Sequence, residues 1–185
     1  GRSRRATPRR AGGSTTCEGP AVRRRLGPDR PASLRRTSLA PYWNGAQMVI
    51  WSWGTGWRSL AGCPDVIAHE WGHAITSYTS NLVYQKESGA LNESFSDMMG
   101  SAFEFAHPTY DTPDWYMGEN GQISGGYFRD ISNPPARFDP DYYGGTYWVN
   151  VVGCTPTDAN DYCGVHTNSG VGNKWFYLIS AGGTH

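Results

Sequence analysis

Residues 69–73 read HEWGH, and Glu93 follows in the stretch NESFSD. His69 and His73 are four positions apart, so on a helix both imidazoles lie on one face and can bind one zinc ion. Glu70 lies on the adjoining face, where its carboxylate can act on a zinc-bound water instead of binding the metal. Glu93 supplies a third ligand. Two histidines and one glutamate leave a tetrahedral zinc with one open position, which hydrolysis requires.

The formal net charge of zero combines two segments of opposite charge. Residues 1–40 contain 11 Arg, no Lys and two acidic residues, a net charge of +9, whereas residues 41–185 contain 5 basic and 14 acidic residues. The basic segment lacks helical or alternating periodicity. Its composition fits a nucleic-acid-binding arm, a disordered segment without a role, or a GC-rich gene read in the wrong frame. We favour the third interpretation, expect disorder there, and predict no nucleic-acid partner.

The remainder of the chain has the pattern of an α+β protein. Residues 42–50 are typical of an edge strand or hairpin arm, with a turn signal at Asn44-Gly45. Residues 50–57 contain three tryptophans and represent either a genuine aromatic loop or a local frame slip. Loops and turns are expected over residues 107–163, which are rich in Gly, Pro, Asp and Tyr. Three helices are expected, over residues 65–79, 89–106 and 165–181.

Each expected helix has apolar side chains that we predict to be buried. They are Val66, Ile67, Ala74, Ile75 and Tyr78 in the first helix, Leu91, Phe95, Met98, Ala102 and Phe105 in the second, and Val171, Trp175, Leu178 and Ile179 in the third. Pro108 should end the second helix, and Gly182 should end the third.

Around the two histidines, residues 66–100 resemble the zinc-binding segment of the thermolysin-like neutral metallopeptidases. The stretches YWNG at residues 42–45 and GVHTNSG at residues 164–170 are similar to the same family, so the resemblance extends over residues 41–185. It implies a zincin-like fold with a small β-hairpin region and zinc-binding helices. Members of the family also have a largely β N-terminal lobe and further C-terminal helices. We therefore expect a partial catalytic domain that lacks most of both lobes, preceded by the separate segment 1–40.

The resemblance assigns catalytic roles beyond the zinc ligands. Glu70 would take the proton of the attacking water and pass it to the leaving amine. Tyr84 and His166 match the two residues that donate to the tetrahedral oxyanion, and Asp161 matches the aspartate that orients this histidine. Asp97 is positioned to accept the second ring N–H of a zinc-binding histidine.

Substrate binding is also implied by the resemblance. Arg129 matches the arginine that binds the substrate carbonyl near the cleavage point. Val66, Met117 and Phe128 are expected walls of the pocket that takes the residue after the scissile bond. This pocket would favour bulky apolar side chains.

Calcium is the second expected metal. The four carboxylates that match structural calcium ligands of the family belong to Asp65, Glu104, Asp114 and Glu119, and hard oxygen ligands suit Ca²⁺. The alternative is four ordinary solvated acids. Cys154 and Cys163 bracket a short segment and form either a disulfide, as is reasonable in an exported protein, or two free thiols.

The sequence thus predicts a secreted, zinc-dependent endopeptidase acting on peptide or protein substrates. Two alternatives remain: an inactive, zinc-stabilised fragment or peptide-binding module, and a zinc aminopeptidase. No signal peptide is recognisable, and no apolar run is long enough to cross a membrane. The sequence does not indicate an oligomeric state.

Overall fold

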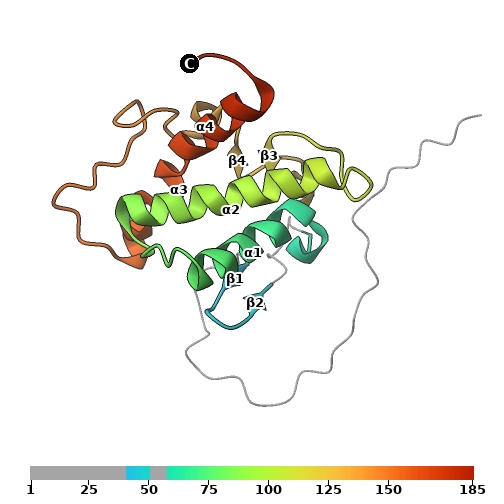
Figure 1. Ribbon diagram of the computed structural model, residues 1–185, viewed down its shortest axis with the longest axis horizontal. Coiled ribbons are helices and arrows are strands. Elements are labelled where there is room, and N and C mark those ends of the chain that lie inside the picture. Colours follow the sequence, from blue (N-terminus) through green and yellow to red (C-terminus); the bar gives the residue numbers. More distant parts are fainter. Residues whose placement is uncertain (1–40, 51–57) are drawn as a thin grey trace, which may run out of the picture.

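The computed structural model describes residues 41–50 and 58–185. The expected disorder of residues 1–40 and the interpretation of the tryptophan-rich stretch at residues 51–57 lie outside these described residues. Within them, four α-helices and two short antiparallel ribbons form the fold (Figure 1). No helix in the described ranges is both long and apolar enough to cross a membrane.

Two consecutive helices, α1 (Pro64–Tyr78) and α2 (Lys86–Ala106), pack side by side at the centre (Figure 1). α1 begins with a proline in its first turn and with Asp65, which suits the positive end of the helix dipole. α2 begins at Lys86, three residues before its expected start at Gly89. It ends at Ala106, as expected from the following His-Pro pair.

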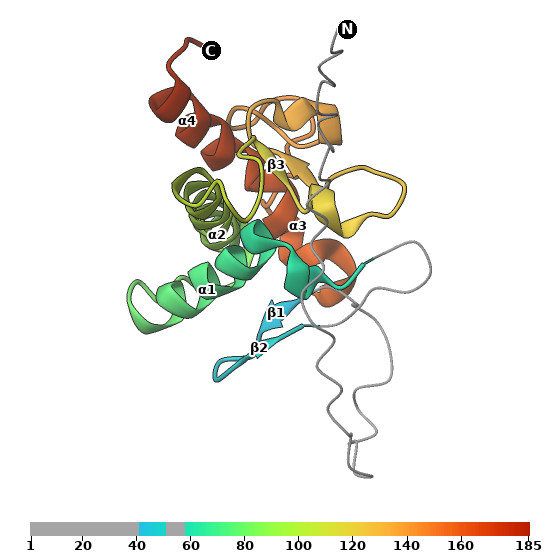
Figure 2. The same cartoon turned by 90° about the vertical axis from the view of Figure 1, so that its right-hand side faces the viewer.

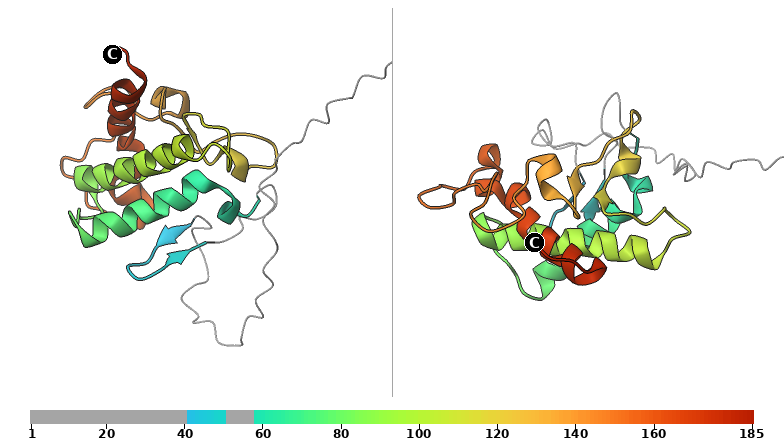
Figure 3. Two further views of the ribbon diagram at one scale, coloured as in Figure 1. Left: turned by 45° about the vertical axis from the view of Figure 1, so that its right-hand side comes forward. Right: turned by 90° about the horizontal axis from the view of Figure 1, so that it is seen from above.

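Two-residue strands form both ribbons. β1 (Tyr42–Trp43) pairs with β2 (Met48–Val49), and the side chain of Asn44 closes their turn by accepting the amides of residues 46 and 47. This ribbon lies on the side of α1 opposite α2 (Figure 3). β3 (Tyr116–Met117) pairs with β4 (Arg129–Asp130) and brings the latter strand toward α2.

The expected helix over residues 165–181 is present, but it is divided in two and is preceded by an additional turn. The structure has two helices instead: α3 (Asp161–Asn168), which packs beside α2, and α4 (Gly170–Ala181), which lies beyond α2 as seen from α1 (Figure 2). The first turn of α3 is left-handed, with φ positive at every residue from Asp161 to Gly164. Gly164 is required there, because a Cβ would lie 2.6 Å from the Cβ of Val149.

A disulfide between Cys154 and Cys163 joins the preceding loop to this left-handed turn. Of the two alternatives for these cysteines, a disulfide or two free thiols, the structure has the disulfide. In the described part of the chain, short 3₁₀ helices complete the connections: η2 (Leu60–Gly62), η3 (Glu119–Gly121), η4 (Pro134–Arg137) and η5 (Asp158–Asn160).

The predicted buried stripe of α2 is wrong. Leu91, Phe95 and Phe105 are exposed, and the face turned inward is polar. Its buried residues include Asn92, Glu93, Ser94, Ser96, Asp97, Ser101 and Glu104. The reason is close helix packing: a Cβ on Gly72 of α1 would lie 2.7 Å from the Cα of Ser96, so only small side chains fit between the helices.

Several other predicted core positions are also exposed. They are Ile75, Tyr78, Ala102, Trp175 and Ile179, whereas Val66 and Ala74 are buried as expected. A core cluster forms beside the start of α1 from Leu60, Cys63 and Val66, with Phe128 packed against it. Val66 and Phe128 of this cluster also form part of the wall of a cleft beside α1.

Candidate metal centre and active site

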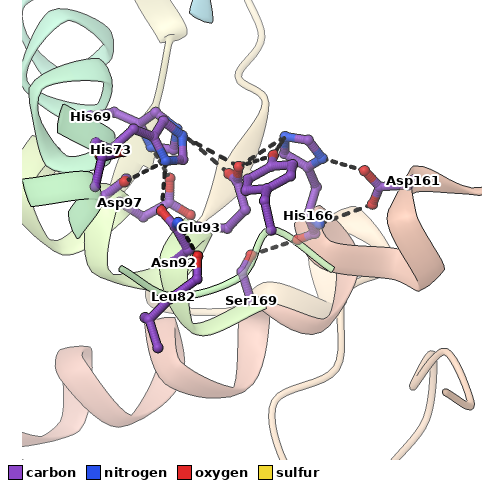
Figure 4. A network of polar contacts seen from close by, with 12 residues as sticks. His69, His73, Leu82, Asn92, Glu93, Asp97, Asp161, His166 and Ser169 are labelled. Carbon is purple, nitrogen blue, oxygen red and sulfur yellow. Dashed lines mark hydrogen bonds and ion pairs between the residues drawn. The ribbon is translucent and has the colours of Figure 1, made fainter. Parts of the chain in front are cut away.

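His69, His73 and Glu93 converge on one point between α1 and α2 (Figure 4). The two imidazole Nε2 atoms are 3.0 Å apart, and each lies within 3.5 Å of a Glu93 carboxylate oxygen. The Glu93 side chain is completely buried, and its Oε2 has no hydrogen-bond partner. A buried carboxylate oxygen facing two imidazole nitrogens fits a divalent zinc ion, which takes nitrogen and oxygen ligands.

The other ring nitrogens of both histidines are held by acceptors on α2. His69 Nδ1 lies 2.8 Å from Asp97 Oδ1, which is where the sequence prediction placed this aspartate. His73 Nδ1 lies 2.8 Å from Asn92 Oδ1 and 3.1 Å from Ser96 Oγ. These contacts fix the ring orientation and leave both Nε2 atoms facing the point of convergence.

Glu70 is buried beside the two histidines and lines the adjoining cleft. Its Oε2 has no hydrogen-bond partner. Burial raises the pKa of the Glu70 carboxyl, and the neighbouring imidazoles oppose that shift. A carboxyl with a raised pKa is better suited to receive and return a proton near neutral pH.

Tyr84 and His166 face the same point from outside the two central helices. Tyr84, in the loop before α2, donates a hydrogen bond to Glu93 Oε1. The Tyr84 hydroxyl and Nε2 of His166 are 3.3 Å apart. Asp161 pairs with His166 Nδ1 and accepts the His166 amide at 2.9 Å. Burial lowers the pKa of His166, but Glu93 and Asp161 outweigh it and raise that pKa.

A cleft of about 240 Å³ opens beside the histidines. Its lining includes the three predicted apolar walls, the predicted arginine and two catalytic candidates: Pro41, Val66, His69, Glu70, Met117, Phe128, Arg129 and His166. Arg129 reaches the cleft from β4 and is held by two hydrogen bonds to Asp97. The structure therefore brings the predicted substrate-binding residues together with the predicted catalytic residues.

A second cluster, of carboxylates, lies at the far end of α2. Carboxylate oxygens of Glu104, Asp111 and Glu119 come within 4.8 Å of one another. Both oxygens of Glu104 and one each of Glu119 and Asp65 are buried without a hydrogen-bond partner. Burial together with the neighbouring acids raises the pKa of Glu104 to about 9 and that of Glu119 to about 8. Unpaired buried carboxylates fit a calcium ion.

The predicted membership of this cluster needs one adjustment. Asp65 lies close enough for its charge to raise the pKa of Glu104 and Glu119, and its Oδ2 accepts the Gly118 amide at 2.5 Å. Asp114 is near enough to raise the pKa of Glu104, but its carboxylate accepts the amide of Tyr116 in its own loop. Asp111 stands in the converging group instead.

The sequence profile of the alpha-helical domain of thermolysin metallopeptidases matches residues 80–185, more than half of the chain. The chain belongs to this family. Its membership agrees with the helical architecture and with the metal-ligand geometry on α1 and α2.

Similar proteins of the thermolysin family are longer. The bacillolysin of Bacillus cereus is 46% identical over 150 residues, covering 78% of this chain and 24% of that protein. The thermolysin of Alicyclobacillus acidocaldarius subsp. acidocaldarius is 43% identical over 148 residues, covering 78% and 25%. The chain thus spans about a quarter of the length of these curated relatives.

A solved structure is similar as well. The precursor of protealysin, a metalloproteinase from Serratia proteamaculans, superimposes with a TM-score of 0.60 and 30% identity. The match covers 76% of this chain and 46% of that one.

Four residues that hold this thermolysin-family site were missed by the sequence reasoning. They are Asn92, Ser96, Asp111 and Asn173. Asn92 stands next to Glu93, and Asn173 Nδ2 donates to Asp97 Oδ2 at 2.8 Å. Asn92 and Asn173 are buried amides, but an amide in the sequence does not reveal which partner it will have.

Proposed function

We propose that the chain is a secreted, zinc-dependent endopeptidase that cleaves before a bulky apolar residue. One observation carries this proposal: the three converging ligand atoms of His69, His73 and Glu93 adjoin a cleft lined by Glu70 and Arg129. Three ligands on one side leave space for a water and a substrate carbonyl on the other. The disulfide supports an oxidising, extracellular location.

A bound zinc ion would polarise the scissile carbonyl and lower the pKa of its water. Glu70 takes the proton from the attacking water and passes it to the leaving amine. The Tyr84 hydroxyl and the His166 ring donate to the oxyanion, and Asp161 keeps the proton-bearing nitrogen of His166 turned toward the cleft. Arg129 binds a substrate carbonyl with its guanidinium while Asp97 keeps that group in place.

The apolar specificity follows from the cleft. Val66, Met117 and Phe128 come from three separate segments and line the same cavity. Met117 is 1% exposed and Val66 5% exposed, so the surrounding fold packs against both side chains. An apolar substrate side chain in this cavity gains about 1.5 to 3 kcal/mol from burial, which a glycine at the same position lacks.

Calcium at the carboxylate cluster is the second part of the proposal. The unpaired oxygens of Asp65, Glu104 and Glu119 support it, as does the convergence of Asp111. Two positive charges would compensate the buried acids that otherwise repel one another. The cluster ties α1 and α2 to the segment before β4, so its proposed role is structural.

The function is tested on the full chain loaded with zinc. A peptide blocked at both ends, with one central Phe, should be cleaved before Phe, and the same peptide with Gly there should be cleaved at least about tenfold less. Glu70→Gln should retain zinc by elemental analysis and lose about 100- to 10,000-fold in kcat. The exposed Glu87→Gln serves as the matched control.

The outcomes separate the alternatives. Cleavage only of peptides with a free amino end would indicate an aminopeptidase. Zinc and peptide binding without any hydrolysis would indicate a binding module. Full activity of Glu70→Gln would exclude the proposed proton transfer.

A further inference from the structure

Tyr162 touches the proposed oxyanion donor Tyr84. The two ring centroids are 5.6 Å apart, and the rings cross at 70°, an edge-to-face contact. Such aromatic pairs contribute about 0.5 to 1.5 kcal/mol beyond the burial of their area. The Tyr84 ring also meets His73 and His166, with centroids 5.9 and 6.3 Å away. Tyr162 differs from His73 and His166, because it takes no part in the proposed proton or metal chemistry.

The backbone of Tyr162 is held in an unusual conformation. Its φ is 49° and its ψ is 38°, within the left-handed turn that begins α3. A residue with a Cβ loses about 1 to 2 kcal/mol in this region, so the surrounding structure must impose it. The direction in which the Tyr162 ring points is therefore set by the loop around it.

Three constraints fix this turn. The Tyr162 amide donates to the Thr157 carbonyl at 2.8 Å. The next residue, Cys163, is fully buried and is bonded to Cys154. The side chain of Asn160 accepts the Cys163 amide at 3.1 Å and donates to the Thr155 carbonyl at 2.9 Å. The backbone is therefore held at Tyr162 by Thr157 and at the next residue, Cys163, by the disulfide and Asn160.

We propose that Tyr162, locked by the Cys154–Cys163 bridge, is a positioning residue that holds the phenol of Tyr84 toward the oxyanion. This inference rests on the proposed function and adds a residue to it. Tyr84 lies on the loop between α1 and α2 and is 36% exposed, and the edge contact with Tyr162 supports its ring in addition to the hydroxyl contacts with Glu93 and His166. A displacement of about 1 Å in a catalytic group can lower turnover by about 100-fold.

The same turn carries Asp161 and leads into His166. Tyr162 lies directly after Asp161, which pairs with the His166 ring. One disulfide-closed segment therefore supports both proposed donors: His166 through Asp161, and Tyr84 through Tyr162. Because a substitution of Tyr162 leaves the Asp161 carboxylate in place, the two supports can be tested separately.

The test is a double-substitution cycle in the full chain loaded with zinc. Tyr162→Ala should lower kcat by about tenfold and change KM by less than about twofold, with zinc content unchanged. Tyr162→Phe keeps the ring and should restore kcat to within about twofold of the parent. In a Tyr84→Phe background, Tyr162→Ala should lower kcat by less than about twofold, because the phenol that it positions is already absent.

A structural readout and a control accompany the cycle. Fluorotyrosine at position 84 should give one narrow ¹⁹F resonance in the parent, and a broadened or split resonance in Tyr162→Ala. Tyr142→Ala is the control, since Tyr142 is exposed and its ring meets His185 rather than the site. It should change neither kcat nor the ¹⁹F signal.

Each outcome decides something specific. Hydrolysis by the parent with equal losses from Tyr162→Ala in both backgrounds would overturn the positioning role while leaving the proposed function intact. An unchanged kcat and ¹⁹F signal in Tyr162→Ala would overturn it as well. No hydrolysis by the zinc-loaded parent would instead overturn the proposed function, and this inference with it.

Discussion

Arg129 donates two hydrogen bonds to Asp97, from Nε to Oδ2 at 2.7 Å and from Nη2 to Oδ1 at 2.6 Å. Asp97 is completely buried. Burial raises the pKa of Asp97, but the charge of Arg129 and the hydrogen bond with His69 outweigh it and lower that pKa to about 2. One carboxylate therefore connects the proposed substrate-binding arginine to a proposed zinc ligand.

Removing this carboxylate should affect stability and metal binding together. Asp97→Ala removes the carboxylate that makes both hydrogen bonds to the largely buried Arg129, and we expect a loss of about 3 to 5 kcal/mol in the free energy of unfolding. Without the acceptor at its Nδ1, His69 should bind zinc about 10- to 100-fold more weakly. Urea unfolding and zinc competition with a chelator measure the two effects.

Controls for this prediction are available in the chain. Asp97→Asn keeps one oxygen acceptor and should lose less zinc affinity than Asp97→Ala. Asp158→Asn changes an exposed aspartate on η5 and should alter neither quantity. A folded Asp97→Ala variant with the parent's zinc affinity would contradict the role given to Asp97.

His166 should matter for turnover and not for zinc content. Its Nε2 lies 3.3 Å from the Tyr84 hydroxyl and faces the same carboxylate oxygen of Glu93. His166→Phe removes one oxyanion donor, for which we expect about a 100- to 1,000-fold loss in kcat. Elemental analysis of the same sample should give an unchanged zinc content. Loss of zinc from His166→Phe would show instead that this ring supports the metal centre.

The carboxylate cluster predicts how calcium changes the pH dependence of stability. The pKa values of Glu104 and Glu119, about 9 and about 8, lie above their ordinary value of 4.5. Their protonated forms stabilise the metal-free fold fully below pH 4.5, and this stability is lost as pH rises through 8 and 9. Calcium binds the ionised forms, so it should stabilise increasingly over the same range.

Thermal unfolding of desalted, metal-free protein between pH 5 and 9 measures this effect. A calcium concentration of about 100 times the dissociation constant measured at pH 8 should raise Tm by about 5 to 10 °C at pH 8. The same calcium concentration should raise Tm by less at pH 5. Magnesium should do less, because it gives up its waters reluctantly. Glu119→Gln should weaken the calcium effect more than Asp114→Asn. An equal calcium effect at both pH values would exclude titration of these carboxylates.

The local part of the site was predictable from sequence. His69 and His73 share a helix, so their spacing alone fixes their relative geometry. Glu93 and His166 lie on other elements. Glu93 was assigned from its place in the NESFSD stretch after the two histidines, whereas only the resemblance to a known family connected His166 with them. Asp111 was missed because the conformation of its loop, rather than residue type, decides whether Asp111 or Asp114 turns toward Glu104.

The buried face of α2 could not be predicted from hydropathy. The periodicity selected Leu91 and Phe95, but the helix turns Asp97 and other polar groups inward. Asp97 is stable there because it pairs with His69 of α1, Arg129 of β4 and Asn173 of α4, contacts that lie far away in sequence. The left-handed start of α3 was missed because the disulfide to Cys154 and the side chain of Asn160 impose it, and residue types alone do not reveal either contact.

The disulfide gives the last prediction. Replacing both Cys154 and Cys163 by Ala removes the bond that closes the loop between them, and the two residues have a sequence separation of 9. Loop-closure entropy predicts a loss of about 2 to 3 kcal/mol in the free energy of unfolding, which denaturant titration measures. Because the bridge also holds the turn that carries Asp161, kcat should fall about tenfold under conditions in which the variant is fully folded. A fully folded variant with lower stability but parental kcat would show that the bridge only stabilises, and that Asn160 suffices to hold the turn.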